Sequence, residues 1–342
     1  MSPSNPTEFA PDKDAGLFAG ARLPDQADVI VIGVPWEPTV SYGRGTSQAP
    51  ARMVPASHQL DYFVPFLGRE FADEVAMLPL NQSWLDANQR CISLADPILA
   101  EGGRLSGDLA ENLAQINQIS EQINGELEDL TRHWLKQGKI VAVLGGDHSS
   151  PLGSMRAHLA RFPDMGVLHI DAHHDLRQAY EGFTYSHASI MYNYLTQNAP
   201  KGPLVSVGIR DYAQAEREFA EKDPRITTFY DADLAAAAFK GTSWSRQCDQ
   251  IIAALPQQVY ISCDIDGLEP GCCPNTGTPV PGGLSFNQTL FLIDRLRHHK
   301  KQVVGFDLCE VSPNQDRDDD EWDLNVGARL LHRLCAAAYQ GK

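Results

Sequence analysis

Short, uninterrupted apolar runs recur along the chain and predict β-strands. Most of them lack the apolar/polar alternation of a strand with one wet face, so each is expected to be covered on both faces, as parallel strands are. The predicted strands are Asp28–Gly33, Lys139–Leu144, Gly166–Ile170, Leu204–Gly208, Thr227–Tyr230, Val259–Asp264 and Val303–Leu308.

Stretches with a helical period lie between these runs. They are Glu111–Lys136, Pro151–Arg161, Ala213–Glu221, Ser245–Leu255, Asn287–His298 and Asp323–Ala338. Strands that alternate with helices predict an α/β fold, a three-layer α/β/α arrangement with a mostly parallel central sheet. In such sheets ligands bind beyond the carboxyl ends of the strands, so we expect the chemistry there.

Aspartates and histidines gather where three of the predicted strands end. Alternate side chains of an extended segment share a face, so a spacing of two brings them to one spot. Each group alone could be a polar loop or a turn into a helix, whereas three groups at strand ends favour a metal site. The residues are His148 after the second run, Asp171, His173 and Asp175 after the third, and Asp264 and Asp266 at the end of the sixth.

The ligand chemistry narrows the choice of metal. Carboxylates and imidazoles without cysteine suit divalent manganese, with nickel as the alternative and cobalt or zinc also acceptable. Four aspartates and two histidines are too many for one tetrahedral ion; if Asp171 and Asp264 each bridge, the set serves two divalent metal ions. Two ions roughly 3.5–4 Å apart can turn a shared water into a nucleophile at neutral pH. We therefore expect a hydrolase with a binuclear metal centre.

Three motifs resemble those of the ureohydrolases, the superfamily of arginase, agmatinase and formimidoylglutamase. They are Gly145–Ser149, Asp171–Asp175 and Ser262–Pro270 with its continuation Gly277–Gly283. The resemblance spans about residues 29–334, is strongest to agmatinase-like members and implies an arginase-like fold. It also implies the two ligand sets, His148, Asp171, Asp175 and Asp264 for one metal, and Asp171, His173, Asp264 and Asp266 for the other.

The resemblance further implies catalytic roles. His187, in a Ser-His pair, matches a histidine that carries a proton to the departing amine, although Ala188 stands where the family has glycine. Glu310, in Glu-Val-Ser-Pro after the last predicted strand, matches a carboxylate that holds the guanidinium or amidine group bidentately. Asp175 is expected to hold the attacking hydroxide by a hydrogen bond while remaining a ligand. A guanidine substrate would yield urea and an amine.

The sequence leaves the substrate open. Leu176-Arg177 replaces the hydroxyl and amide residues of arginase-like and agmatinase-like members, and formimidoylglutamases carry Asp-Leu-Arg at this point. Arg177 could hold a substrate carboxylate, or it could pair with Glu181 in a local turn. Formimidoylglutamases usually lack the Ser-His pair, so the chain combines two patterns. The alternatives to an agmatine-like guanidine are a small or N-alkylated guanidine or biguanide, and formimidoylglutamate.

Two loops are expected to form the substrate pocket. Gly267–Ser285 is a long Gly/Pro-rich connection that begins at the predicted ligands. The other loop runs from Leu176 to Ser189 and carries Phe183 and Tyr185, whose rings are predicted to line the pocket mouth. Such rings suit the face of a substituted cation. Tyr42, in the N-terminal part of the chain, is either a further ring of this mouth or a core residue.

Composition excludes several classes of function. The net charge of −16 disfavours a nucleic-acid partner and is compatible with a small cationic substrate. No apolar run reaches membrane-spanning length, and the first 27 residues lack the apolar core of a signal peptide. The seven cysteines do not suggest a disulfide framework in so large a chain. These observations predict a soluble cytoplasmic enzyme.

We expect one ureohydrolase domain over residues 1–342, with residues 1–27 as an N-terminal extension. Related enzymes form trimers and hexamers, so a homo-oligomer is expected, and a mixed assembly with a homologue is the alternative. A hypothesis of another class is a catalytically silent subunit of such a mixed assembly. A complete ligand set is the feature that argues against silence, and all six predicted ligands are present.

Overall fold

An eight-stranded parallel sheet forms the centre of the computed structural model, which describes residues 15–20 and 22–340. Seven of its strands correspond to the seven predicted ones. Their order in the sheet is β4 (Val75–Met77), β1 (Val29–Val34), β5 (Ile140–Gly145), β10 (Gln302–Cys309), β9 (Gln258–Asp264), β6 (Gly166–Ile170), β7 (Leu204–Ile209) and β8 (Ile226–Tyr230). A separate antiparallel pair joins β2 (Phe63–Val64) and β3 (Arg69–Glu70).

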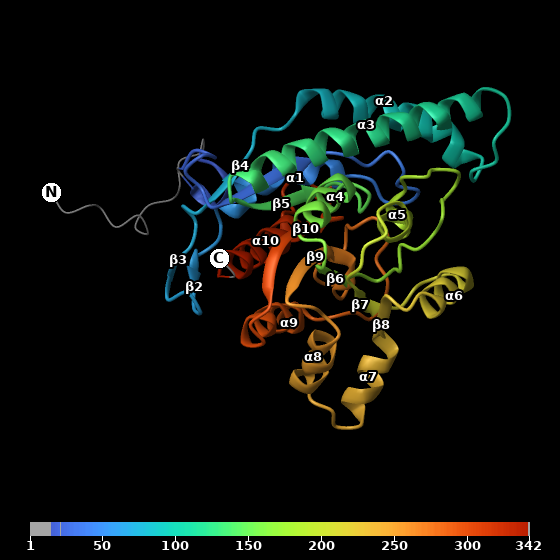
Figure 1. Cartoon of the computed structure of the whole chain (residues 1–342). Coiled ribbons are helices and arrows are strands. Elements are labelled where there is room, and N and C mark those ends of the chain that lie inside the picture. The colour runs from blue at the N-terminus through green and yellow to red at the C-terminus, as the bar shows by residue number, and fades with distance from the viewer. Residues whose placement is uncertain (1–14, 21, 341–342) are drawn as a thin grey trace.

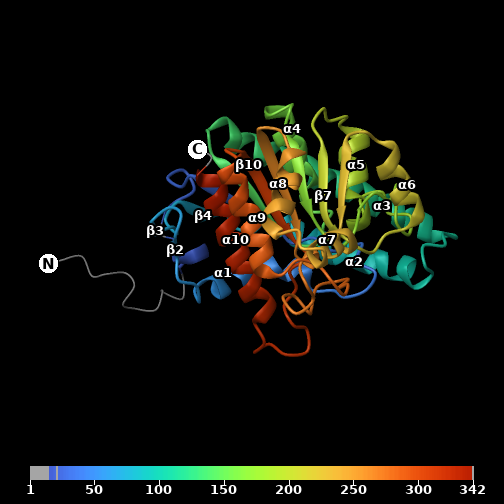
Figure 2. The same ribbon diagram turned by 90° about the horizontal axis from the view of Figure 1, so that it is seen from below.

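Helices cover both faces of the sheet, which confirms the three-layer α/β/α prediction (Figure 1, Figure 2). One layer contains α1 (Ala49–Ser57), α7 (Asp231–Phe239), α8 (Trp244–Ala253), α9 (Phe286–His298) and α10 (Trp322–Gln340). The other contains α2 (Gln82–Ala100), α3 (Asp108–Lys136), α4 (Leu152–Arg161), α5 (Ile190–Gln197) and α6 (Gln214–Lys222).

The central strands are mostly apolar because alternate residues face different helix layers. In β1, Val29 and Val31 belong to the core cluster under α10, whereas Ile30 and Ile32 belong to the cluster under α2 and α3. A strand with two buried faces has no position for a solvated side chain. This explains why the strand signal in the sequence was a continuous run.

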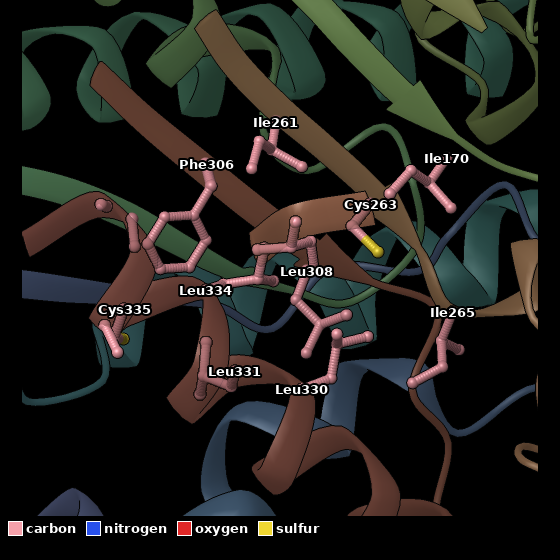
Figure 3. Close-up of a cluster of buried hydrophobic side chains, with 14 of the residues drawn as sticks. Ile170, Ile261, Cys263, Ile265, Phe306, Leu308, Leu330, Leu331, Leu334 and Cys335 are labelled. Carbon is pink, nitrogen blue, oxygen red and sulfur yellow. The ribbon is translucent and has the colours of Figure 1, made fainter. Parts of the chain in front are cut away.

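The packing of α10 against the middle of the sheet fixes the strand that carries Glu310. Figure 3 shows Leu331 and Leu334 of α10 beside Phe306 and Leu308 of β10, and all four side chains are fully buried. Full burial of such a side chain contributes roughly 1.5–3 kcal/mol. The end of β10, and therefore Glu310 directly after it, is held by a fully buried apolar contact between helix and sheet.

Several elements were not predicted from the sequence, and α2 is the longest of them. Its buried side chains include Trp84, Cys91 and Ile98, which repeat every seven residues, and the Asn81 side chain caps the helix by accepting a hydrogen bond from the Ser83 N–H. The apolar repeat and the capping residue that predict this helix are therefore present in the sequence. The other unpredicted elements, all of them short, include the helices α1, α5 and α7, the sheet-edge strand β4 and the pair β2 and β3.

Part of the predicted N-terminal extension packs into the core. Residues 1–14 of that extension lie outside the described residues. Leu17 and Phe18, in the short 3-10 helix η2 (Leu17–Ala19), are buried, and the Phe18 ring meets the His332 ring edge-on at 5.0 Å. The apolar pair was too short to stand out in a polar segment.

Candidate metal centre and active site

Four neighbouring strands bring the predicted site residues together. The ligands lie at the carboxyl ends of β5, β6 and β9, and Glu310 follows β10. The sheet order places these strands side by side as β5-β10-β9-β6. As a result His148 and Glu310, 162 positions apart, are in direct contact, and the His148 N–H donates to Glu310 Oε1 at 3.0 Å.

The first group of predicted ligands surrounds His148. Its Nδ1 lies 3.0 Å from Oδ2 of Asp171, 3.0 Å from Oδ2 of Asp175 and 3.4 Å from Oδ2 of Asp264. All four side chains are buried. One nitrogen and three carboxylate oxygens thus converge on one point, as a metal ion requires.

The second group surrounds His173. Its Nδ1 lies 3.1 Å from Asp266 Oδ2 and 3.5 Å from Asp171 Oδ1. Asp171 uses one oxygen in each group, which is the arrangement expected of a bridging carboxylate. The Asp266 N–H donates to Asp264 Oδ1 at 2.8 Å and so fixes the relative position of these two acids in the 3-10 helix η5 (Ile265–Gly267).

The predicted strand end at Ile170 is confirmed, but the extended alternation expected to bring Asp171, His173 and Asp175 together is not what the structure shows. β6 ends at Ile170, and the His173 N–H donates to Asp171 Oδ1 at 2.6 Å, which turns the chain. Asp175 has φ of 53°, in the left-handed region that disfavours a side chain. A turn, not strand alternation, therefore brings the three side chains to one place.

The charges of the site fit bound cations. Burial, together with the carboxylates of Asp266 and Asp171, raises the pKa of Asp264 well above its usual value. Burial and the neighbouring Asp171 also raise the pKa of Asp175 to about 6. Asp171 itself is buried, but the imidazoles of His169, His148 and His173 hold its pKa well below its usual range. Buried carboxylates this close repel one another, and divalent cations between them would remove that cost.

Polar residues within the strands support the ligands from behind, and none of them was predicted. His148 Nε2 lies 2.9 Å from Ser262 Oγ, and this hydroxyl donates to Asp307 Oδ1 at 3.1 Å. Ser262 therefore accepts the Nε2 proton, which leaves Nδ1 of His148 for a metal. His169, within β6, supports another predicted ligand: its Nε2 lies 2.8 Å from Asp171 Oδ2. The available signal was a polar residue inside an otherwise apolar strand next to a ligand.

A cavity of about 420 Å³ opens above the predicted metal ligands. Its wall includes Gly277, Thr278, Pro279 and Val280, which confirms the prediction that the loop Gly267–Ser285 borders the site. His187 and Glu310 both line it, together with the ligands His148, His173, Asp175, Asp264 and Asp266.

His187 begins the 3-10 helix η4 (His187–Ser189), whose preceding Ser186 accepts a hydrogen bond from the Ala188 N–H. The His187 ring meets the Tyr180 ring edge-on at 6.0 Å. Burial, assisted by the nearby His173, His148 and Arg177, lowers the pKa of His187 to about 4. The ring is therefore neutral near neutral pH.

Glu310 is held in an unusual conformation. Its φ is 62°, its N–H donates to Gly146 O at 2.8 Å, and its carbonyl accepts from Thr276 Oγ1 at 2.8 Å. Burial and the carboxylate of Asp147 raise the pKa of Glu310 well above its usual value. Asp147 is fully buried, and burial raises its own pKa to about 7 although Ser149 and Thr39 donate to it. A buried acid of this kind gains most from a cationic partner.

Phe183 and Tyr185 do not line the cavity, which corrects the prediction for both. Phe183 is fully buried in the cluster under α2 and α3. Tyr185 is half-buried and packs against the cluster around α4 and α5. The rings that do line the cavity are Tyr42, Tyr180 and Tyr212. The direction of a side chain in an irregular loop was not readable from the sequence.

Arg177 lines the cavity, but its charge already has a partner. Its Nε lies 3.4 Å from Oε2 of the buried Glu216, and its guanidinium lies over the Tyr180 ring at 4.6 Å from the centroid. The ion pair is thus with Glu216 on α6 and not with the neighbouring Glu181. The pairing with Glu216 was not predicted because the two residues are far apart in the sequence.

Arg210, also missed, fastens the wall of the site. Its guanidinium donates to the carbonyls of Asp266, Leu268 and Val280 at 2.6, 3.1 and 2.9 Å. It therefore ties the end of β7 to both ends of the stretch that follows the ligands.

The fold and site define a class of protein: metal-dependent hydrolases of C–N bonds in linear amidines, built on a parallel α/β/α sheet. The model of the Arginase family matches residues 27–337, and the chain belongs to this family. It is 33% identical to the N(1)-aminopropylagmatine ureohydrolase of Thermus thermophilus over 293 residues, which cover 85% of this chain and 84% of that relative.

Two further comparisons agree. The agmatinase of Bacillus subtilis is 27% identical over 310 residues, covering 91% of each chain. The crystal structure of the agmatine ureohydrolase of Thermoplasma volcanium superposes with a TM-score of 0.72 at 26% identity, covering 95% of this chain and 94% of that one.

Proposed function

We propose that the protein is an agmatinase-like amidinohydrolase that releases urea from a small guanidine-type cation. The observation that carries the proposal is the position of Glu310, a buried carboxylate that faces the same cavity as His187 and five of the six predicted ligands. A planar guanidinium placed against Glu310 would have its carbon above those ligands.

The residues that would hold two divalent ions are His148, Asp171, Asp175 and Asp264 for one and Asp171, His173, Asp264 and Asp266 for the other. The oxygen and imidazole donors suit manganese first, with nickel as the alternative. When bound, the ions would supply a water-derived nucleophile at neutral pH and stabilise negative charge at the reacting carbon.

The chain's own groups would divide the remaining work. Glu310 would orient the cation and expose its carbon to attack. Asp175, whose second oxygen remains available, would hold the attacking water by a hydrogen bond. His187, neutral at the start, would accept a proton and deliver it to the departing nitrogen, so that the amine leaves as a stable product.

The charges around the cavity support a cationic substrate. Asp211, Glu216 and Glu310 line it, and Arg177 is the one lysine or arginine of its lining in the described part of the chain. Because Arg177 is paired with Glu216, it is poorly suited to anchor a substrate carboxylate. This favours an agmatine-like guanidine, or a small or N-alkylated guanidine or biguanide, over formimidoylglutamate.

We further propose a homo-oligomer, such as a trimer or hexamer, in the cytoplasm, without nucleic-acid or membrane partners. Within residues 15–20 and 22–340, no helix combines the length and apolarity needed to span a bilayer. The alternative of a silent subunit in a mixed assembly is disfavoured by the converging ligands, because a silent site has no need to keep buried acids together.

Product analysis tests the substrate proposal. Metal-loaded protein is incubated with agmatine, arginine, guanidinobutyrate, free guanidine, an alkyl biguanide and formimidoylglutamate, and the products are identified by mass spectrometry. Urea from a guanidine is the expected result. Urea or guanylurea from the biguanide would favour the N-alkylated class, and formamide would reinstate Arg177 as an anchor. If every substrate fails with both metal positions filled, the silent subunit becomes the better hypothesis.

Glu310→Gln is expected to lower kcat/KM roughly a hundredfold, because removal of one partner of a buried charge pair costs about 2–5 kcal/mol. Steady-state kinetics and metal analysis are measured together. The matched control is Glu74→Gln, which removes another buried carboxylate, paired with Arg69 outside the cavity, and should leave kcat/KM unchanged. Unchanged kinetics for Glu310→Gln would remove this residue from the site.

A further inference from the structure

The loop after β1 is fastened to the turn that carries His148. The Asp147 N–H donates to Trp36 O at 2.8 Å, and the Gly146 N–H donates to Val34 O at 2.8 Å. A Cβ at Gly146 would lie 2.1 Å from Trp36 O, so the approach requires glycine. Thr39, a few residues further along this loop, is fully buried.

Thr39 joins two residues that are far apart in the sequence. Its Oγ1 lies 3.2 Å from Asp147 Oδ2 and 3.4 Å from His187 Nδ1. The same oxygen accepts the backbone N–H of His187 at 3.3 Å. The hydroxyl is therefore surrounded by three polar groups and contacts no solvent.

The hydrogen-bonding capacity of a hydroxyl determines which group donates to which. It offers one proton and two lone pairs. Asp147 is an acceptor when ionised, and its Oδ1 already accepts from both the N–H and the hydroxyl of Ser149, at 3.0 and 2.5 Å. The Thr39 proton is thus directed to Asp147 Oδ2. The two lone pairs of Thr39 remain for the N–H and the Nδ1–H of His187.

We propose that Thr39 and Asp147 are positioning residues that hold His187 as its Nδ1–H tautomer, with Nε2 free to exchange protons in the cavity. The proposal rests on the proposed function of His187. Nε2 takes up a proton and then gives it to the departing nitrogen, so the ring returns to its neutral form and the Nδ1 proton stays in place. Asp147 accepts the Thr39 proton at Oδ2 and so keeps both lone pairs of the Thr39 hydroxyl directed to His187.

Thr39→Val tests this role because valine keeps the shape of threonine and removes the hydroxyl. The kcat is expected to fall roughly 10–100-fold, since the His187 ring loses the hydroxyl that orients it. KM and the metal content should stay as in the wild type. Thr39→Ser retains the hydroxyl and should restore most of kcat.

The matched control is Thr46→Val. Thr46 is also fully buried, lies in the same loop region and donates to a buried carboxylate, Glu37 Oε2, at 3.1 Å. It does not contact His187, so its loss should leave kcat unchanged even if the melting temperature falls.

The double variant Thr39→Val/His187→Asn separates this inference from the proposed function. If Thr39 acts through His187, the double variant has the same kcat as His187→Asn alone. A normal kcat for Thr39→Val beside an impaired His187→Asn enzyme would overturn the inference and leave the proposed function intact. A normal kcat for His187→Asn would overturn the proposed function itself. Loss of metal from Thr39→Val would show a structural role and also overturn the inference.

Discussion

Asp264→Asn is expected to lose metal binding and activity while leaving the metal-free protein at least as stable as the wild type. The Asp264 carboxylate is buried beside Asp266 and Asp171, and burial with these neighbours raises its pKa well above the usual range. Its charge is therefore unfavourable without a cation. Asparagine keeps the oxygen that accepts the Asp266 N–H, so the start of η5 is preserved. Activity should fall by about a thousandfold or more, because the metals contribute several kcal/mol.

The measurements are melting temperature with chelator, melting temperature with added manganese or nickel, and elemental analysis. The wild type should bind two ions per chain and gain stability from them. Asp294→Asn, which removes an acid paired with Arg333 outside the cavity, should still bind both. Fewer than two ions in fully active wild-type enzyme would contradict the binuclear site.

Asp171→Asn is expected to change the stability of the metal-free protein in the opposite direction to Asp264→Asn. The Asp171 carboxylate lies against His148, His169 and His173, which hold its pKa well below the usual value. Removing its charge leaves these buried rings with a weaker partner, which should destabilise the metal-free protein by roughly 1–3 kcal/mol. The free energy of unfolding in urea, measured for Asp264→Asn and Asp171→Asn in the presence of a metal chelator, distinguishes the two variants. Equal destabilisation by both substitutions would contradict this account of the charges.

His187→Asn is expected to lower kcat roughly 10²–10⁴-fold, as removal of a general acid does, with KM and both metals retained. The ring lines the cavity but is not one of the six proposed ligands, so its loss should not release metal. Its pKa of about 4 means that it begins the cycle neutral and must first accept the proton that it later donates.

His332→Asn is the control for this variant. His332 is also a buried histidine, with Nε2 2.6 Å from Phe71 O, and it lies among core rings outside the cavity. Its replacement should lower stability without changing kcat. An unchanged kcat in His187→Asn, or loss of metal from it, would remove His187 from the proton-transfer step.

Asp264→Asn tests the predicted metal ligands, whereas His187→Asn tests the proton-transfer group beside them. The six predicted ligands lie at or directly after strand ends, whereas His187 begins a 3-10 helix and Glu310 has positive φ. The positive φ of Glu310 is strained for a residue with a side chain and persists only where the surroundings hold it. This is why packing far from the site, such as that of α10 against β10, matters to the chemistry.

Most of the fold could be predicted because its signals are local. Continuous apolar runs at β1, β5, β6, β7, β9 and β10 reflect two buried faces, and this property is visible in any short window of the sequence. The ligands were also visible, since carboxylates and imidazoles directly after such runs must meet at one edge of a parallel sheet. The helix α2 was not predicted although the sequence carries its apolar period and its Asn81 cap.

The sequence by itself determined the class of fold and the six candidate ligands, and its resemblance to the ureohydrolases pointed to His187 and Glu310 near them. Only the tertiary structure decided which side chains enter the cavity: it buried Phe183, turned Tyr185 aside, paired Arg177 with Glu216 and placed Thr39 between Asp147 and His187. The physical reason is distance along the chain. Strand and ligand signals depend on neighbours within a few residues, whereas these contacts join loops and helices whose meeting is settled by the packing of the whole sheet.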